Sequence, residues 1–281
     1  MAYVSNYPQA PFDAVMPAGP QEIVLGIAAV ALAGFVLLAL AMCVKHRTAL
    51  PLLFLVAGFC TVLLEPMVTH VGHAIHPEIG QIQLFKTHDR AIPWHIATIY
   101  AFYFGGVFMF MFSRIREGRF TRDFVWKSYF FTCALAYLIE IVPVHVGLWV
   151  YYEPQALWVW KGGMPLFWTF VNAGCIYMAL TLIKLFYPVL RGWKEILVVP
   201  IAGMGAIMGH FGAGYLYYNA ANSAAPQWLV EAAGLGSVGL ALTITWFCSR
   251  LLAANTAAIF SVEAAAPARA GAPAGAATRA A

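Results

Sequence analysis

Seven long apolar stretches decide what this chain can fold into. A helix needs about 20 predominantly apolar residues to cross a bilayer, and each stretch supplies a run of that order. Of the 281 residues, 62% are hydrophobic and only 10% are charged, whereas soluble domains contain about 25% charged residues. The alternating pattern of a membrane β-barrel is not seen. The sequence therefore predicts an all-α bundle of seven transmembrane helices over residues 22–44, 50–71, 93–113, 124–150, 164–189, 195–217 and 227–254.

The distribution of positive charge predicts how this bundle is oriented. With the N-terminus outside, 13 of the 16 Lys and Arg residues fall in or beside cytoplasmic segments. Positive charge in short loops is retained on the cytoplasmic side. We therefore expect the N-terminus outside and the C-terminus in the cytoplasm, with Lys86, Arg90 and Lys161 outside. Since the basic loops are explained as topology signals, nothing indicates a nucleic-acid partner.

The chain divides into an outer N-terminal segment (1–21), the membrane domain (22–254) and a cytoplasmic tail (255–281). The N-terminal segment contains no Lys or Arg and so lacks the basic region of a signal peptide, which predicts that the first helix is a retained anchor. The tail is rich in Ala, Pro and Gly and is predicted to be disordered. Two long connections, 72–92 and 151–163, are expected on the outer side.

Three glutamates lie within predicted spans. An ionisable side chain inside the bilayer is costly and is a functional hypothesis by default. Glu65 and Glu140 are too far from a helix end to be hydrated there, which favours a functional role. Glu231 lies near the start of its helix, where a carboxylate is also stabilised by the helix dipole. A pair of buried carboxyl groups can provide an acid and a base for catalysis.

Other polar residues are predicted at the same depth. His145 and His210 come late in helices that run outward, while His95 and Asn172 come early in helices that run inward. Together with the glutamates they predict one site in the outer half of the membrane. For His210 and Asn172, hydrogen bonding between packed helices is an alternative role.

The sequence His70-x2-His73-x2-His76 resembles a set of metal ligands. Residues three apart on a helix are rotated by about 60°, so the first and last histidines would point about 120° apart. We therefore predict no metal site. The chain also lacks a GxGxxG loop, a P-loop and a cysteine cluster, and we predict no nucleotide, flavin or iron–sulfur cofactor.

Two segments carry a resemblance to a known family. The first is Leu64-Glu65-Pro66-Met67-Val68, then Gly72, Pro77, Gly80-Gln81, Phe85 and Ile92-Pro93-Trp94, leading to Tyr100. The second is Ile139-Glu140, Pro143, Gly147, Tyr151-Tyr152, Pro154-Gln155, Pro165, Trp168 and Asn172. Over residues 20–255 the chain resembles the AveC-like spirocyclases, bacterial membrane proteins named for the spiroketal-forming enzyme of avermectin biosynthesis. Thr69 stands where that pattern has an Asp, and Glu153 stands where it has a small residue.

The resemblance implies acid-catalysed cyclisation without a redox cofactor, with Glu65 and Glu140 as the acid/base pair. It implies that His70, His145 and Asn172 orient the reacting groups. We expect the catalytic residues to be Glu65, Glu140, His145 and His70, and the substrate to be bound by Asn172, Tyr151, Tyr152, Trp168, Trp94, His95, His210 and Glu231.

The leading hypothesis is thus a membrane cyclase or isomerase of the bacterial inner membrane, acting on a lipophilic polyketide- or terpenoid-like substrate. Its expected partners are that small molecule and membrane lipid. A membrane terpene cyclase or sterol isomerase would use the same kind of acid and aromatic cavity, and a lipid-binding or transport protein is the alternative from another class. A retinal protein is disfavoured because residues 227–254 contain no Lys for a Schiff base.

Overall fold

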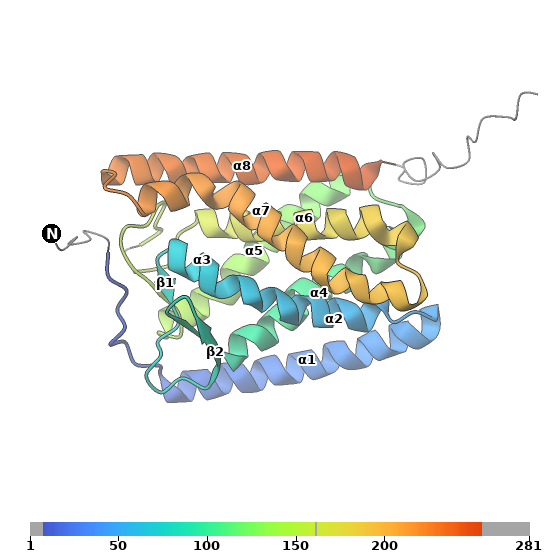
Figure 1. Cartoon of the computed structure of the whole chain (residues 1–281), viewed down its shortest axis with the longest axis horizontal. Coiled ribbons are helices and arrows are strands. Elements are labelled where there is room, and N and C mark those ends of the chain that lie inside the picture. Colours follow the sequence, from blue (N-terminus) through green and yellow to red (C-terminus); the bar gives the residue numbers. More distant parts are fainter. Residues whose placement is uncertain (1–7, 161, 255–281) are drawn as a thin grey trace, which may run out of the picture.

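The computed structural model describes residues 8–160 and 162–254 (Figure 1). In this part of the chain, seven helical segments are long and apolar enough to cross a membrane, so the predicted all-helical, multi-pass bundle is confirmed. The disorder predicted for 255–281 concerns a segment outside the described residues. The spanning helices are α1 (Ala18–His46), α2 with α3 (Leu50–Thr61 and Glu65–Val71), α4 (Trp94–Glu117), α5 (Arg122–His145), α6 (Phe167–Phe186), α7 (Val198–Ala221) and α8 (Gln227–Ala253).

The second span is interrupted directly before Glu65. Helix α2 gives way to a 3-10 turn, Val62–Leu64, and α3 begins at Glu65. Pro66 explains the break, because a proline has no backbone N–H to donate to the preceding turn and is best tolerated at the start of a helix. Glu65 therefore lies at a junction deep in the span, where the chain can turn its side chain inward.

The fourth span is shorter than predicted. Helix α5 ends at His145, five residues before the expected end at residue 150. Gly147 then adopts a left-handed backbone conformation, with φ of +78°, which ends the helical path. The expected boundary was wrong because Leu148–Tyr151 are as apolar as the helix itself, although Val150–Tyr151 form strand β4.

Helices α2 and α4 approach each other at glycines. A Cβ atom placed on Gly58 would lie 2.7 Å from the backbone N of Gly105, and one placed on Gly105 would lie 2.6 Å from the carbonyl O of Phe54. Small residues allow such backbone contact between membrane helices. This contact fixes the position of α4, which carries Tyr100 and Tyr103 into the bundle.

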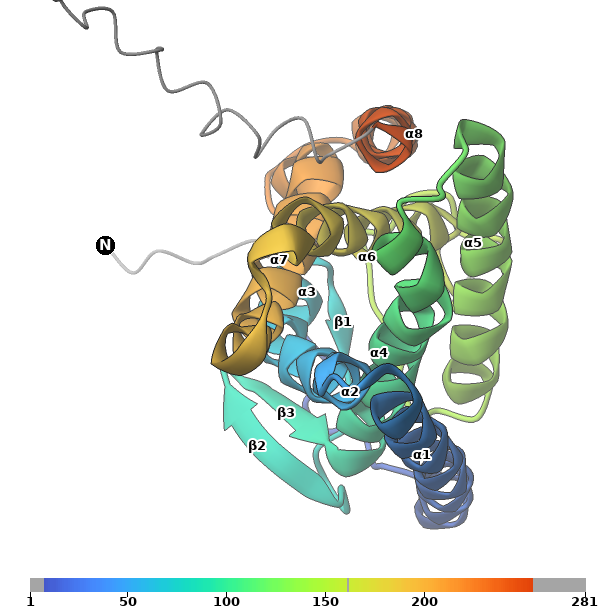
Figure 2. The same ribbon diagram turned by 90° about the vertical axis from the view of Figure 1, so that its right-hand side faces the viewer.

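The two long connections fold together at one end of the bundle. Strand β1 (Ala74–Ile75) pairs with β4 in antiparallel register, Ala74 opposite Tyr151. Gln155 donates from Nε2 to the carbonyls of Gly72 and His73, both at 2.9 Å. A second pair, β2 (Gln83–Thr87) and β3 (Arg90–Pro93), lies beside them. We call this the loop-rich end, and the opposite end, where α4 joins α5, the basic end (Figures 1 and 2).

The chain preceding α1 is bound to the loop-rich end. The backbone N–H of Met16 donates to the carbonyl of Ile79 at 2.8 Å, and the Gln21 side chain accepts from Ile82 N at 2.7 Å. Helix α1 thus begins at Ala18, earlier than the predicted residue 22. The start of α1 and the end of α8 lie at opposite ends of the bundle (Figure 1).

Candidate functional site

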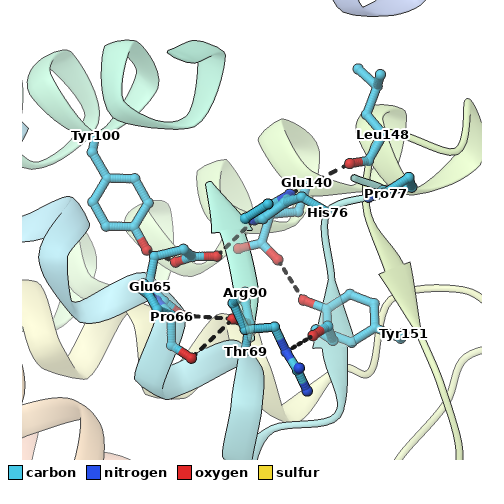
Figure 3. Close-up of polar contacts among 12 residues, drawn as sticks. Glu65, Pro66, Thr69, His76, Pro77, Arg90, Tyr100, Glu140, Leu148 and Tyr151 are labelled. Carbon is cyan, nitrogen blue, oxygen red and sulfur yellow. Dashed lines mark hydrogen bonds and ion pairs between the residues drawn. The ribbon is translucent and has the colours of Figure 1, made fainter. Parts of the chain in front are cut away.

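Glu65 lies in the interior with a relative exposure of 1%. One carboxylate oxygen, Oε2, accepts a hydrogen bond from the Tyr100 hydroxyl of α4. The other, Oε1, lies 3.1 Å from Nε2 of His76, which follows β1. The carboxyl group is therefore held between a membrane helix and a connection of the loop-rich end (Figure 3).

His76 is bound through both ring nitrogens. Its Nδ1 lies 3.4 Å from the carbonyl O of Leu148, and since a carbonyl only accepts hydrogen bonds, this contact belongs to the tautomer with a proton on Nδ1. The hydrogen bond between Nε2 and Glu65 allows a proton to pass between the imidazole and the carboxyl group.

Glu140 is the second buried carboxyl group, with an exposure of 7%. Its Oε2 accepts from the Tyr151 hydroxyl at 3.0 Å, and its Oε1 accepts from Nδ2 of Asn172 at 2.7 Å. Among the described residues, no Lys, Arg or His nitrogen lies within 4.0 Å of this carboxylate. Glu140 differs from Glu65 in that both of its oxygens are bound by uncharged donors.

The two carboxyl groups line adjoining spaces. The space at Glu140 has a volume of about 40 Å³ accessible to the centre of a water molecule, and the space at Glu65 about 10 Å³. Tyr100, Trp149 and Asn172 line both, and thus form the partition between them. We call the two spaces together the carboxylate cavity. Their volumes leave room for only a few water molecules, so a larger ligand requires the helices to separate.

The walls of the carboxylate cavity are mainly apolar and aromatic. Those around Glu140 include Leu64, Ile96, Ile99, Phe104, Ala136 and Pro143. Three wall residues have buried polar groups with no hydrogen-bond partner in the described structure: the hydroxyl of Tyr103, Nε1 of Trp149 and Nε1 of Trp168. Buried polar groups are rarely left unpaired. All three can donate a hydrogen bond to an oxygen of a ligand.

Six of the twelve expected site residues are brought together at this cavity. They are Glu65, Glu140, Tyr151, Asn172, Trp168 and His210. Trp168 lies 5.5 Å from His210 between ring centroids, and Nδ1 of His210 bonds the Tyr218 hydroxyl at 2.8 Å. His95 does not line the cavity but is buried beside it, with its ring centroid 6.4 Å from that of His76.

His145 does not lie with Glu140, so the expected position of this histidine beside the carboxylates is wrong. The two residues are five positions apart on α5, which places them about 140° apart around the helix axis. Glu140 is buried whereas His145 is exposed. The expectation was based on depth along the span, and depth alone does not determine which face of a helix a residue occupies.

The remaining expected residues also lie outside the cavity. His70 is exposed at the loop-rich end, and Trp94 is 43% exposed at the start of α4. Glu231 accepts from the backbone N–H of Leu157 at 2.7 Å and so ties α8 to a connection. Tyr152 stacks on His73 with ring centroids 5.1 Å apart. His70 and His73 line one hollow at the loop-rich end, whereas His76 faces Glu65, so the three histidines do not form a common ligand set.

Two residues of the cavity, Tyr100 and Trp149, were missed as site residues, and so was His76, the partner of Glu65. His76 was considered only as part of a histidine run at the aqueous boundary. The pairing of β1 with β4 brings His76 to Glu65, and no local feature of the sequence predicts that pairing. Tyr100 had one available signal, since it ends the first segment of the family resemblance.

No family model, no curated protein and no solved structure matches this chain.

Proposed function

We propose that the protein is a membrane cyclase or isomerase that uses acid–base chemistry on a lipophilic polyketide- or terpenoid-like substrate. The observation that carries the proposal is the pair of buried glutamates, Glu65 and Glu140, on either side of one partition in a mainly apolar cavity. Burying two carboxyl groups in a membrane bundle is costly. The resemblance to spirocyclases supplies the reaction class.

The proposed reaction converts a ketone with two hydroxyl groups into a spiroketal and water. One hydroxyl adds to the carbonyl carbon to give a hemiketal. The hemiketal hydroxyl is protonated and leaves as water, which produces an oxocarbenium ion. The second hydroxyl then forms a C–O bond to that carbon and loses its proton, so no oxidant or reductant is required.

The contacts suggest a role for each group. The Glu65–His76 pair is the proton source. Tyr100, which bonds Glu65 and lines the cavity, turns its hydroxyl to give its own proton to the leaving oxygen and takes a replacement proton from Glu65. Glu140, whose oxygens both accept hydrogen bonds, takes the proton of the attacking hydroxyl. The ring faces of Trp149 and Phe104 stabilise the cationic intermediate.

The orientation of the bundle forms part of the proposal. Lys45, Arg47, Arg114, Arg116 and Arg119 belong to the basic end, which we place in the cytoplasm of a bacterium. The loop-rich end then faces outward and the carboxylate cavity lies nearer the outer surface of the inner membrane.

Replacement of each glutamate by glutamine tests the proposal. Both changes keep the side-chain shape, but Glu65→Gln removes the proton donor and Glu140→Gln removes the proton acceptor. Conversion of a lipophilic keto-diol should therefore fall about 10²–10⁴-fold in each variant. Mass spectrometry follows the loss of one water from the substrate. Tyr100→Phe should lower the rate as well. Glu117→Gln, an exposed change at the basic end, is the matched control and should leave the rate unchanged.

Full turnover by both glutamine variants would contradict the acid–base mechanism and favour the lipid-binding or transport alternative. A product of unchanged mass would instead favour the isomerase alternative, in which the same acid and base move a double bond.

A further inference from the structure

A second hollow lies beside the carboxylate cavity, on the side where α5 faces α4 and α1. Its volume is about 360 Å³. It is lined by Phe35 of α1, by Phe102, Tyr103, Gly106, Val107, Phe110 and Met111 of α4, and by Ser128, Phe131, Thr132, Leu135 and Ile139 of α5. We call it the lateral groove. Figure 2 shows the three helices along one side of the bundle.

The lining of the lateral groove is suited to hydrocarbon. The hydroxyls of Ser128 and Thr132 both donate to carbonyls of their own helix, at 2.7 and 2.8 Å, and so offer the groove little polarity. Phe110 and Phe131 are 68% and 69% exposed, whereas Tyr103 and Thr132 are buried. The groove therefore has an open apolar mouth on the membrane surface of the bundle and a buried floor.

The lateral groove and the carboxylate cavity share two wall residues, Tyr103 and Ile139. Each residue lies about one helical turn or less from a residue of the mechanism, since Tyr103 follows Tyr100 on α4 and Ile139 precedes Glu140 on α5. The Tyr103 hydroxyl is buried without a hydrogen-bond partner in the described residues. Tyr103 and Ile139 thus lie between the two hollows.

From this continuity we propose that the lateral groove binds the hydrocarbon part of the substrate, which enters from the bilayer between α4 and α5. The oxygen-bearing part passes Tyr103 and Ile139 to reach the carboxylates, and the Tyr103 hydroxyl donates a hydrogen bond to one of its oxygens. The groove extends along α4 from Tyr103 to Met111, about 12 Å of helix rise, which suits an extended alkyl chain. The inference rests on the proposed function for the nature of the substrate.

Photolabelling of the full-length protein in lipid nanodiscs tests this route without an activity assay. The probes are two long-chain alkyl ketones, one with a diazirine at the chain end and one with a diazirine beside the ketone. We expect the first to label the groove residues of α4 and α5, and the second to label peptides that contain Asn172 or Cys175 of the cavity.

Ile139→Trp should block the passage. It should lower labelling of the cavity by the second probe about tenfold or more, while labelling of the groove by the first probe persists. Leu138→Trp is the matched control, because Leu138 is 64% exposed, lies on the same helix and lines neither hollow. Ile139→Phe provides a smaller block if the Trp variant does not fold.

Cavity labelling that survives in a folded Ile139→Trp protein would overturn the inference and indicate entry from the loop-rich end. Uniform labelling of all lipid-facing helices by both probes would overturn it too. These outcomes are independent of the glutamine variants. A blocked passage together with full turnover by Glu65→Gln and Glu140→Gln would leave the groove as a hydrocarbon site and refute the acid–base mechanism alone.

Discussion

At the scale of single residues, the neighbours of a histidine determine what it can do. His76 and His73 are both buried and lie three residues apart on the same connection, but they differ in their partners. His76 faces a carboxylate, whereas the Nε2 of His73 faces the amide oxygen of Asn222 at 3.2 Å. His76 can therefore exchange a proton with its neighbour, whereas His73 has no carboxylate within 4.0 Å among the described residues.

His73 should make the protein less stable in acid. Burial lowers the pKa of His73 below its ordinary value, the Arg90 charge lowers it further, and the bond to Asn222 opposes the shift. The unfolded chain has a pKa near 6.5 at this residue and so binds more protons than the folded state once the pH falls below about 6.5. The contribution of neutral His73 to the free energy of unfolding is fully present above that pH. It is lost below that pH, by at most about 1.4 kcal/mol per pH unit.

Replacing His73 by Gln should therefore flatten the loss of stability between about pH 6.5 and pH 5. Thermal unfolding in detergent, followed by circular dichroism across this range, measures the effect. His88→Gln, a change at an exposed position of the same connection, is the control. If His73→Gln lost stability with falling pH as steeply as the unaltered protein, other groups would be the cause of that loss.

At the scale of elements, the contact of α2 with α4 determines where Tyr100 lies. A Cβ atom on Gly58 would lie 2.7 Å from both the Gly105 N and the Tyr100 carbonyl O, so Gly58→Ala forces the helices apart. We expect a loss of about 1–3 kcal/mol of stability and a fall in turnover as Tyr100 moves from Glu65. Gly34→Ala in α1 meets nothing within 4 Å and should gain about 0.5–1 kcal/mol.

Unfolding of both alanine variants in the same detergent compares the two sites directly. Equal stabilisation by Gly58→Ala and Gly34→Ala would contradict the close approach of α2 and α4.

The elements were predictable wherever hydrophobicity alone decides them. All seven spans were identified, because a bilayer requires about 20 apolar residues per helix regardless of what the helix contacts. The predicted end of α5 was wrong because β4 is as apolar as the helix. Only the conformation of Gly147 separates the helix from the strand. The break before Glu65 could have been inferred from Pro66.

The site was predictable in part for the same reason. Depth along a span follows from counting residues, which placed Glu65 and Glu140 together. Which face of a helix a side chain occupies depends on packing between helices, and residue counting does not reveal it. His145 was for this reason expected in the cavity, although it is exposed. His76 reaches Glu65 only because two connections pair across 77 positions of sequence, from Ala74 to Tyr151, and the hydropathy pattern does not indicate that pairing.

At the scale of the whole molecule, the charge difference between the two ends should determine the topology. Because basic loops are held in the cytoplasm, a single cysteine introduced at Gly118 in a cysteine-free variant should react with a membrane-impermeant maleimide only after the cells are opened. A cysteine at Gly80 in the loop-rich end should react in intact cells. Reaction of the Gly118 position from outside would reverse the orientation and place the carboxylate cavity near the cytoplasm.

The pairing of β1 with β4 also bears on how the protein matures. Glu65 emerges from the ribosome long before Tyr151 and Asn172, and its partner His76 is positioned only when the Leu148 carbonyl and β4 are in place. A nascent chain that has inserted its first three spans therefore has the glutamate without its proton partner, and it has no enclosed cavity. The proposed chemistry therefore has to wait for the fifth span, which brings Asn172 to Glu140, and for the sixth, which adds His210 to the cavity wall.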